Sequence, residues 1–210
     1  MNYNIISTGS KGNAVIINNI LIDCGISYKA IADYIRQINL LLLTHKHYDH
    51  FKAATVKRLA AERPLLRFGC CQWLVNPLIE CGVRPENIDV YEIGKKYTYN
   101  NFSLIPIKLY HDIPNCGYRL FWGHEKAIYA TDTRTLEGIT AKDYDCYFIE
   151  ANYKTEEIKQ RIAEKEENGE YSYEKRAMNE HLSYEQAINF IYSNIGQNGK
   201  YILLHGHTDE

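Results

Sequence analysis

Three of the chain's 8 histidines and one aspartate fall within six residues, directly after a run of four leucines that ends at Leu43. A short apolar run of this kind predicts a buried strand, so these polar side chains stand where a strand gives way to a loop. Residues two apart in extended chain point the same way, so His45 and His47 can reach one metal ion. Asp49 and His50 come after the chain turns and can face a second ion. Imidazole and carboxylate together suit Zn²⁺ and neighbouring transition metals.

Three later polar residues also stand directly beyond expected strands: His111, Asp132 and His205. A single histidine in such a position is usually an ordinary surface residue, but here three strand ends are filled in the order His, Asp, His. His207 is a rival to His205 for the last place. We prefer His205 because it comes immediately after the apolar run.

The pattern His-x-His-x-Asp-His after an apolar strand resembles the signature of the metallo-β-lactamase superfamily. That resemblance implies the α/β fold of the superfamily, a four-layer αββα sandwich, as one hydrolase domain over residues 1–210 with a dinuclear metal site. By the same resemblance, the first ion would be held by His45, His47 and His111. The second ion would be held by Asp49, His50 and His205, and Asp132 would bridge the two.

Two further segments resemble the tRNA 3′-processing endonuclease tRNase Z. The segment around Glu150 looks like a strand-end glutamate segment of that enzyme, and the segment from His181 to Ala187 looks like its His-Ser/Thr-x-x-x-Gln-Ala helix start. The resemblance implies that His181 contacts the scissile phosphate and that Glu150 orients it. With the metal ligand Asp49, these two are the expected catalytic residues.

Over nearly the whole chain the sequence is similar to the YycJ/WalJ-like single-domain exonucleases. It departs from that branch in residues 154–180 and in Gly206-His207, where Leu-Ser is usual. Asp132 stands where lactam-cleaving members commonly have cysteine. His47, rather than glutamate, argues against the di-iron redox branch.

Composition limits the remaining possibilities. The chain has 210 residues, of which 45% are hydrophobic and 24% charged, with a net charge of -2, so no global basic field attracts nucleic acid. We expect no signal peptide and no membrane span, because no long apolar segment is present. The 6 cysteines are scattered without a Cys-x-x-Cys pair, which favours a reducing cytoplasmic compartment. No protein partner is inferred.

The apolar periodicity predicts alternating helices and strands. We expect helices over 27–37 with Ser27 as the cap, over 53–63, 71–81 and 183–195. Strands are expected over 4–6, 14–17, 20–23, 40–43, 88–92, 96–99, 102–109, 117–122, 126–131, 146–149 and 201–204. The Glu- and Lys-rich segment 153–175 is a solvated helix or a flexible excursion. The Gly-rich stretch 7–13 is either a plain tight turn or a loop lining the metal site.

We therefore expect a metal-dependent hydrolase, most simply a phosphodiesterase or nuclease of the DNA exonuclease type, with two Zn²⁺ or Mn²⁺ ions and a DNA or RNA substrate. The alternative within enzymes is a small-molecule hydrolase acting on a thioester, lactone or cyclic nucleotide. Outside enzymes, the alternative is a metal-stabilised binding protein.

Overall fold

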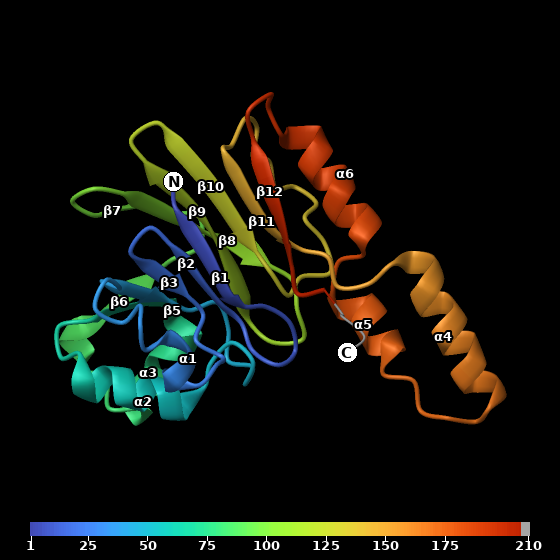
Figure 1. Cartoon of the computed structure of the whole chain (residues 1–210), viewed down its shortest axis with the longest axis horizontal. Coiled ribbons are helices and arrows are strands. Elements are labelled where there is room, and N and C mark those ends of the chain that lie inside the picture. Colours follow the sequence, from blue (N-terminus) through green and yellow to red (C-terminus); the bar gives the residue numbers. More distant parts are fainter. Residues whose placement is uncertain (207–210) are drawn as a thin grey trace. The chain divides into compact units, whose positions relative to one another are not determined.

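The β-strands form two six-stranded sheets in a computed structural model that describes residues 1–206 (Figure 1). The chain divides into two compact units, Met1–Lys95 and a second that begins at Lys96, and each unit contains one of the sheets. The expected mixed α/β class is confirmed. A single domain over 1–210 stays a prediction.

The sheet of the first unit has its strands in chain order, β1 to β6. The first three are antiparallel and β3 to β6 are parallel. The hairpin between β2 and β3 turns at Asn18, whose φ of 53° is one that asparagine tolerates well. The strands are β1 (Tyr3–Ser7), β2 (Ala14–Ile17), β3 (Ile20–Ile22), β4 (Leu40–Leu42), β5 (Arg67–Cys71) and β6 (Ile88–Tyr91).

The helices of the first unit bury their apolar residues in one cluster with its sheet. Val56 and Leu59 of one helix and Leu78 of another belong to the same cluster as Leu41 and Phe68 of the strands. The helices are α1 (Tyr28–Ile31), α2 (Ala53–Glu62) and α3 (Val75–Glu80), with 3₁₀ turns at Gln72–Leu74 and Pro85–Asn87.

The helix expected over 27–37 is wrong in length, since α1 ends at Ile31. Ser27 precedes it but makes no side-chain capping bond. Beyond Ile31 the chain continues in turns bonded three residues back, and the carbonyls of Ile35 and Ile38 accept from the Arg63 guanidinium. Ile31, Ile35 and Ile38 of this region are nevertheless all buried. Tertiary hydrogen bonds therefore replace the helix that the spacing predicts.

The second sheet has the order β12-β11-β10-β9-β8-β7. Its strands β7 to β10 are antiparallel, whereas β10, β11 and β12 are parallel. As a result, β8, β10, β11 and β12 all end at the same edge. The strands are β7 (Tyr97–Thr98), β8 (Ser103–Leu109), β9 (Asn115–Trp122), β10 (Glu125–Ala130), β11 (Cys146–Glu150) and β12 (Lys200–Leu204).

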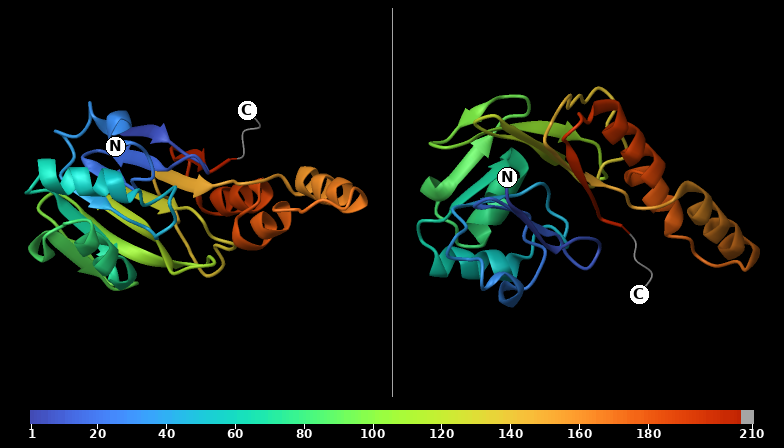
Figure 2. Two further views of the ribbon diagram at one scale, coloured as in Figure 1. Left: turned by 90° about the horizontal axis from the view of Figure 1, so that it is seen from below. Right: turned by 45° about the horizontal axis from the view of Figure 1, so that its top comes forward.

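Three helices belong to the second unit: α4 (Thr155–Glu167), α5 (Glu174–Glu180) and α6 (Tyr184–Asn194). Helix α6 packs on its sheet, and Ala187 and Ile191 share a buried cluster with Ile149. Helix α4 extends away from that sheet with α5 beside it (Figures 1 and 2). Only Ile158 of α4 is buried. Of the two alternatives for the Glu- and Lys-rich segment 153–175, a solvated helix or a flexible excursion, the structure shows the solvated helix. No helix in residues 1–206 has the length and apolar character needed to span a bilayer.

Helix α6 starts with a complete capping box. The Ser183 hydroxyl accepts from the Gln186 backbone N–H, and the Gln186 side chain accepts from the Ser183 N–H. We expect Ser183→Ala to lower the free energy of unfolding by about 1 kcal/mol, because the Gln186 backbone N–H loses its hydroxyl acceptor. Urea unfolding measures this change. The control is Ser193→Ala at an exposed position of the same helix, and an equal effect from both variants would contradict the capping role.

Candidate metal and catalytic site

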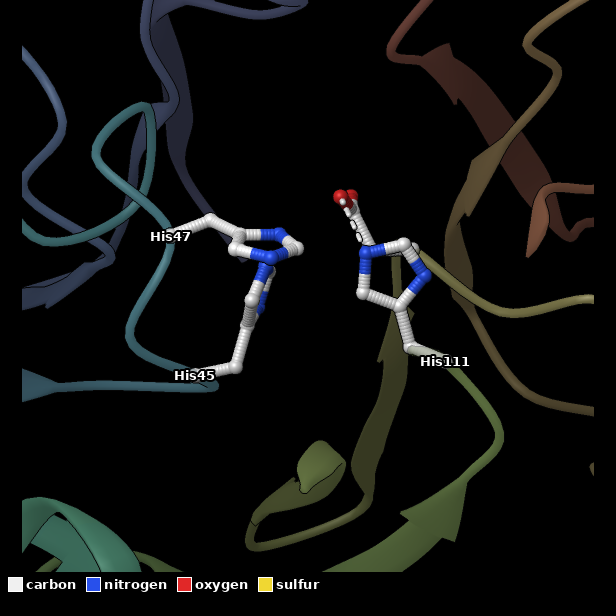
Figure 3. Close-up of side chains that lie close together, drawn as sticks. His45, His47 and His111 are labelled. Atoms are coloured by element: carbon white, nitrogen blue, oxygen red, sulfur yellow. Dashed lines mark ion pairs between the residues drawn. The ribbon is translucent and has the colours of Figure 1, made fainter. Parts of the chain in front are cut away.

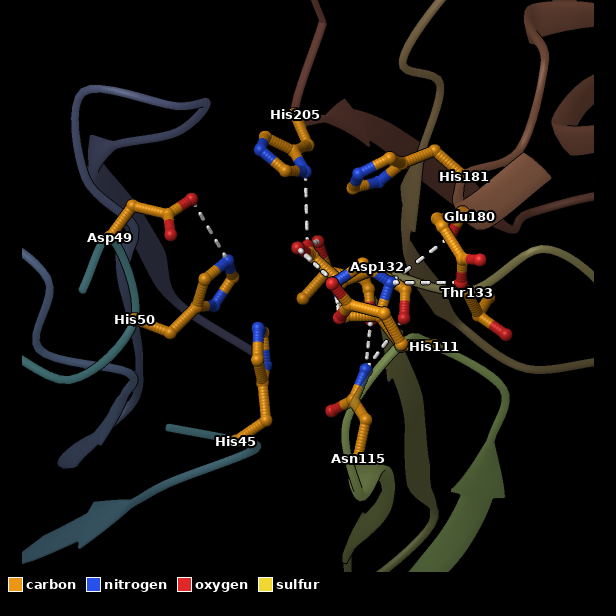
Figure 4. A network of polar contacts seen from close by, with 12 residues as sticks. His45, Asp49, His50, His111, Asn115, Asp132, Thr133, Glu180, His181 and His205 are labelled. Atoms are coloured by element: carbon orange, nitrogen blue, oxygen red, sulfur yellow. Dashed lines mark hydrogen bonds and ion pairs between the residues drawn. The ribbon is translucent and has the colours of Figure 1, made fainter. Parts of the chain in front are cut away.

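The loop after β4 carries the first group of expected ligands. His45 and His47 extend from this loop in Figure 3, with ring centroids 4.9 Å apart. The backbone N–H groups of His50 and Phe51 both donate to the His47 carbonyl, at 2.9 and 2.7 Å. This turn brings Asp49 Oδ2 to 3.5 Å from His50 Nε2 (Figure 4). The expected change of chain direction between the two ligand pairs is therefore present.

A buried carboxylate that the motif does not contain orients this loop. Asp23 follows β3 and is fully buried, and its Oδ2 lies 2.7 Å from His50 Nδ1. Its Oδ1 accepts from the backbone N–H and the hydroxyl of Thr44, both at 2.9 Å. With Nδ1 donating to Asp23, the lone pair of His50 lies on Nε2. An aspartate directly after a buried apolar strand was the signal that could have identified it.

The Gly-rich stretch packs against the same loop. The Asn13 backbone N–H donates to the Asp49 carbonyl at 2.6 Å, and the Asn13 amide nitrogen lies 2.8 Å from His50 Nε2. Of the two alternatives for residues 7–13, these contacts favour a loop that lines the site. Gly25 also belongs to this packing, because a Cβ on it would lie 1.7 Å from the Asp49 carbonyl oxygen.

In the second unit, His111 stands just beyond β8 at the edge where β10, β11 and β12 also end. Its Nδ1 donates to the Glu180 backbone carbonyl at 3.2 Å, which leaves Nε2 as the ligand atom. That Nε2 lies 3.7 Å from Asp132 Oδ2. Burial lowers the pKa of His111 and outweighs the attraction of nearby Asp132, so the ring is held in the neutral form that a metal ion requires.

Asp132 follows β10 with a φ of 56°, in the left-handed region that aspartate can adopt. The Asn115 amide stabilises this conformation by donating to the Asp132 carbonyl at 2.6 Å. The Thr131 hydroxyl donates to Asp132 Oδ1 at 2.8 Å, and the same oxygen lies 3.0 Å from His205 Nδ1 (Figure 4). Burial opposes the charge of His205, but Asp132 and then Glu150 outweigh it and raise the pKa of His205 to about 10.

Glu150 and His181 form a buried pair beside these residues. Glu150 Oε2 lies 3.0 Å from His181 Nδ1, and Oε1 accepts from the backbone N–H groups of Thr133 at 2.6 Å and Leu182 at 3.2 Å. Burial alone would lower the pKa of His181 and raise that of Glu150. Their mutual hydrogen bond outweighs burial, so the pKa of His181 is raised and that of Glu150 is lowered. The expected contact is present, whereas the catalytic roles stay predictions.

The donor chemistry of these groups fits transition-metal ions. Within the second unit, each of four buried or half-buried residues offers a ligand-type atom, and these atoms lie within 4.8 Å of one another: Asp132, Glu150, His181 and His205. In both units a histidine has one ring nitrogen fixed by a protein acceptor, which directs the other nitrogen to a ligand. His207 lies outside the described residues. His124 lies in the β9–β10 turn and is exposed, as expected of a structural residue.

Comparison with known proteins identifies the family. The model of the β-lactamase superfamily domain matches residues 18–205, which is most of the chain. The chain belongs to the β-lactamase superfamily. No curated protein matches the sequence. Membership in this superfamily and the two-sheet fold support a hydrolase with a divalent-metal site.

Solved structures of the metallo-β-lactamase fold resemble the chain over nearly its full length. Human tRNase Z, short form, is 14% identical with a TM-score of 0.72, and the match covers 99% of this chain and 93% of that one. Zn²⁺-bound PqqB from Methylobacterium extorquens is 10% identical with a TM-score of 0.68, covering 98% and 89%. A diphosphatase from the PhnP family is 14% identical with a TM-score of 0.61, covering 97% and 85%. At these identities the likeness establishes the fold.

The close approach of Gly25 to the ligand loop yields a prediction. We expect Gly25→Ala to lower the free energy of unfolding by about 3 kcal/mol and to weaken Zn²⁺ binding, because the new methyl group would displace the Asp49 backbone. Denaturant unfolding and Zn²⁺ titration measure the two effects. Gly94→Ala is the control, since its φ of 82° is strained but its Cβ would meet nothing. Unchanged Zn²⁺ affinity in Gly25→Ala would contradict the proposed contact.

The Glu150–His181 pair yields a second prediction, for the metal-free protein. In Glu150→Gln the burial of His181 remains but the charge that offsets it is lost, so its pKa should fall below the ordinary value of 6.5. NMR titration of the imidazole measures this change. A His181 pKa that is equal in wild type and variant would show that Glu150 does not hold its proton.

The same pair predicts how stability depends on pH. A raised histidine pKa stabilises the fold below 6.5, and this contribution is lost as pH rises through the folded-state pKa. The lowered pKa of Glu150 stabilises the fold above 4.5, and this contribution is lost as pH falls through its folded-state pKa. The stability advantage of wild type over Glu150→Gln should therefore be largest between about pH 4.5 and 6.5.

Proposed function

We propose that the protein is a metal-dependent phosphodiesterase that cleaves nucleic acid, of the YycJ/WalJ-like exonuclease kind. The observation that carries the proposal is the buried Glu150–His181 pair. The carboxylate raises the pKa of the imidazole and fixes its Nδ1, and the ring centroid of His181 lies 5.0 Å from that of His111 and 5.1 Å from that of His205. A hydrolase of neutral esters has no anionic phosphate for the protonated imidazole to contact.

We further propose that the ligand groups of the two units serve one centre of two divalent ions, Zn²⁺ or Mn²⁺, with Asp132 shared between them. The support is superfamily membership together with the donor set of each unit. Such ions, when bound, supply a water of lowered pKa and positive charge for the phosphate oxygens. The remaining ligands are those expected from the sequence: His45, His47, Asp49, His50, His111 and His205.

The role of His181 follows from its hydrogen bonds. Because Nδ1 is fixed by Glu150, Nε2 is the atom presented to a substrate. In its protonated form, which Glu150 favours, it would donate to a non-bridging phosphate oxygen or give its proton to the leaving oxygen. Glu150 does not touch the phosphate in this scheme and acts by positioning His181.

None of the 6 cysteines forms a disulfide, which supports a reducing location such as the cytoplasm.

The second candidate is a small-molecule hydrolase. The fold is shared with a diphosphatase of the PhnP family, so cleavage of a small phosphate ester remains compatible with a phosphate-directed His181. A thioester or lactone hydrolase instead leaves His181 without a role.

The test compares wild type with His181→Ala after loading with Zn²⁺ or Mn²⁺. Elemental analysis should give about two equivalents of metal for both proteins. Cleavage of labelled single- and double-stranded DNA and RNA should fall about 10²–10⁴-fold in His181→Ala. His124→Ala, an exposed histidine, is the matched control and should cleave at the wild-type rate.

Two outcomes would overturn the proposal. Undiminished cleavage by His181→Ala would remove its phosphate role. A wild type that hydrolyses a thioester or small phosphate ester but no DNA or RNA would establish the second candidate instead.

A further inference from the structure

A basic pocket of about 340 Å³ lies in the first unit beside the ligand loop. It is lined by residues of that loop, of the start of α2 and of α3. We define the basic pocket by its charged and aromatic side chains: Lys46, Tyr48, Lys52, Lys57 and Glu80. Lys46 stands between His45 and His47 in the chain, and Tyr48 stands between His47 and Asp49, so two residues of the ligand loop line the pocket.

The charge of the basic pocket is uncompensated. Three lysines face one glutamate, and none of the three forms an ion pair with a residue in the described part of the chain. Some lysines elsewhere are paired, for example Lys154 with Glu157 at 2.7 Å and Lys165 with Glu174 at 2.6 Å. Unpaired lysines gathered at a hollow, in a chain whose net charge is -2, create a local positive field that favours an anion.

The start of α2 adds to this field. Lys52 is its N-cap residue, no side chain caps the helix, and its first turn contains no acidic residue. The positive end of the helix dipole is therefore not neutralised locally, and Ala53 and Ala54 of this first turn also line the basic pocket.

Tyr48 supplies a flat surface at the same place. It is 69% exposed, the third highest among the exposed large hydrophobic residues, and the Lys52 ammonium lies 5.2 Å from its ring centroid. In the chain, the ring stands between the expected ligands His47 and Asp49. Stacking of an unpaired base is a contact that an exposed tyrosine beside lysines makes well.

On the basis of the nucleic-acid cleavage proposed above, we propose that the basic pocket binds the single-stranded segment adjoining the cleaved bond. The three lysines contact backbone phosphates, and Tyr48 stacks on one unpaired base. A small neutral substrate would leave the lysines without a function. The basic pocket thus selects a polyanionic strand over a small ester.

The experiment measures equilibrium binding of a labelled single-stranded 12-mer oligonucleotide to metal-loaded protein between 50 and 200 mM salt, in the slowly cleaving His181→Ala background. We expect Lys52→Ala/Lys57→Ala to bind more weakly and to reduce the slope of log affinity against log salt by about 0.7 per lysine. Lys29→Ala is the matched control, because it removes one exposed lysine of the same unit outside the basic pocket. Its affinity and slope should equal those of the parent.

Tyr48 is tested separately from charge. Tyr48→Ala should weaken binding roughly 5- to 150-fold with an unchanged salt slope, since it removes stacking and no charge. Tyr48→Phe keeps the ring and should bind like the parent. Circular dichroism and thermal unfolding establish that each variant folds.

An unchanged affinity and salt slope in the double lysine variant would overturn the proposal. Binding does not require cleavage, so this outcome is distinguishable from failure of the proposed function. If the protein cleaves DNA or RNA with no dependence on these lysines, the proposed function stands and the proposed role of the basic pocket is refuted. If it binds the strand through these lysines without cleaving it, only the proposed function is refuted.

Discussion

A carboxylate taken out of water must have its charge and lone pairs satisfied by hydrogen bonds. Each unit of this protein has such a buried carboxylate beside its expected ligands. Asp23 in the first unit holds His50 and Thr44, and Glu150 in the second holds His181 and the backbone after it. The partners of Asp23 come from the loop after the neighbouring parallel strand β4. Those of Glu150 come from the loop after the parallel strand β10 and from the segment between α5 and α6. The same bonds that make burial tolerable therefore fix which ring nitrogen each histidine presents.

Backbone conformation at the strand ends serves the same purpose. Asp23, Asp132 and His205 all follow strands and all have φ between 53° and 59°, although none is glycine. Each such residue costs free energy that its surroundings must offset, of the order of 1–3 kcal/mol. The offsetting bonds are visible at Asp132, whose carbonyl accepts from Asn115. The left-handed turn redirects the chain at once, so the side chain stays at the edge of the sheet.

The pKa values of the histidines at the candidate site are shifted in different directions. Burial lowers the pKa of His111, which favours the neutral form of a ligand, whereas carboxylates raise the pKa of His181 and raise that of His205 to about 10 in the metal-free protein. A metal ion at His205 would displace its proton, so the affinity of this residue for a metal ion must decrease as the pH falls. Phosphodiester cleavage needs cations both at the reacting phosphorus and along the strand. In the proposed cleavage of nucleic acid, His181 and the lysines of the basic pocket would supply these cations in a chain whose net charge is -2.

The sequence alone determined the superfamily, most of the strands and helices, and the strand-end positions of the expected ligands, because apolar periodicity and a dense local motif are short-range signals. It also predicted a helix from residue 183, whose capping box at Ser183 lies within three residues. The strand β5 was not predicted, and the helix expected over 71–81 is a 3₁₀ turn followed by the shorter α3. Only the tertiary structure assigned Asp23 to His50, packed Gly25 against Asp49, and ended α1 at Ile31. Asp23 and His50 are 27 positions apart, and which strands are neighbours decides such contacts. Likewise, a hydrogen bond from the distant Arg63 guanidinium to the Ile38 carbonyl holds the chain after α1 in turns, where the local spacing predicts a longer helix.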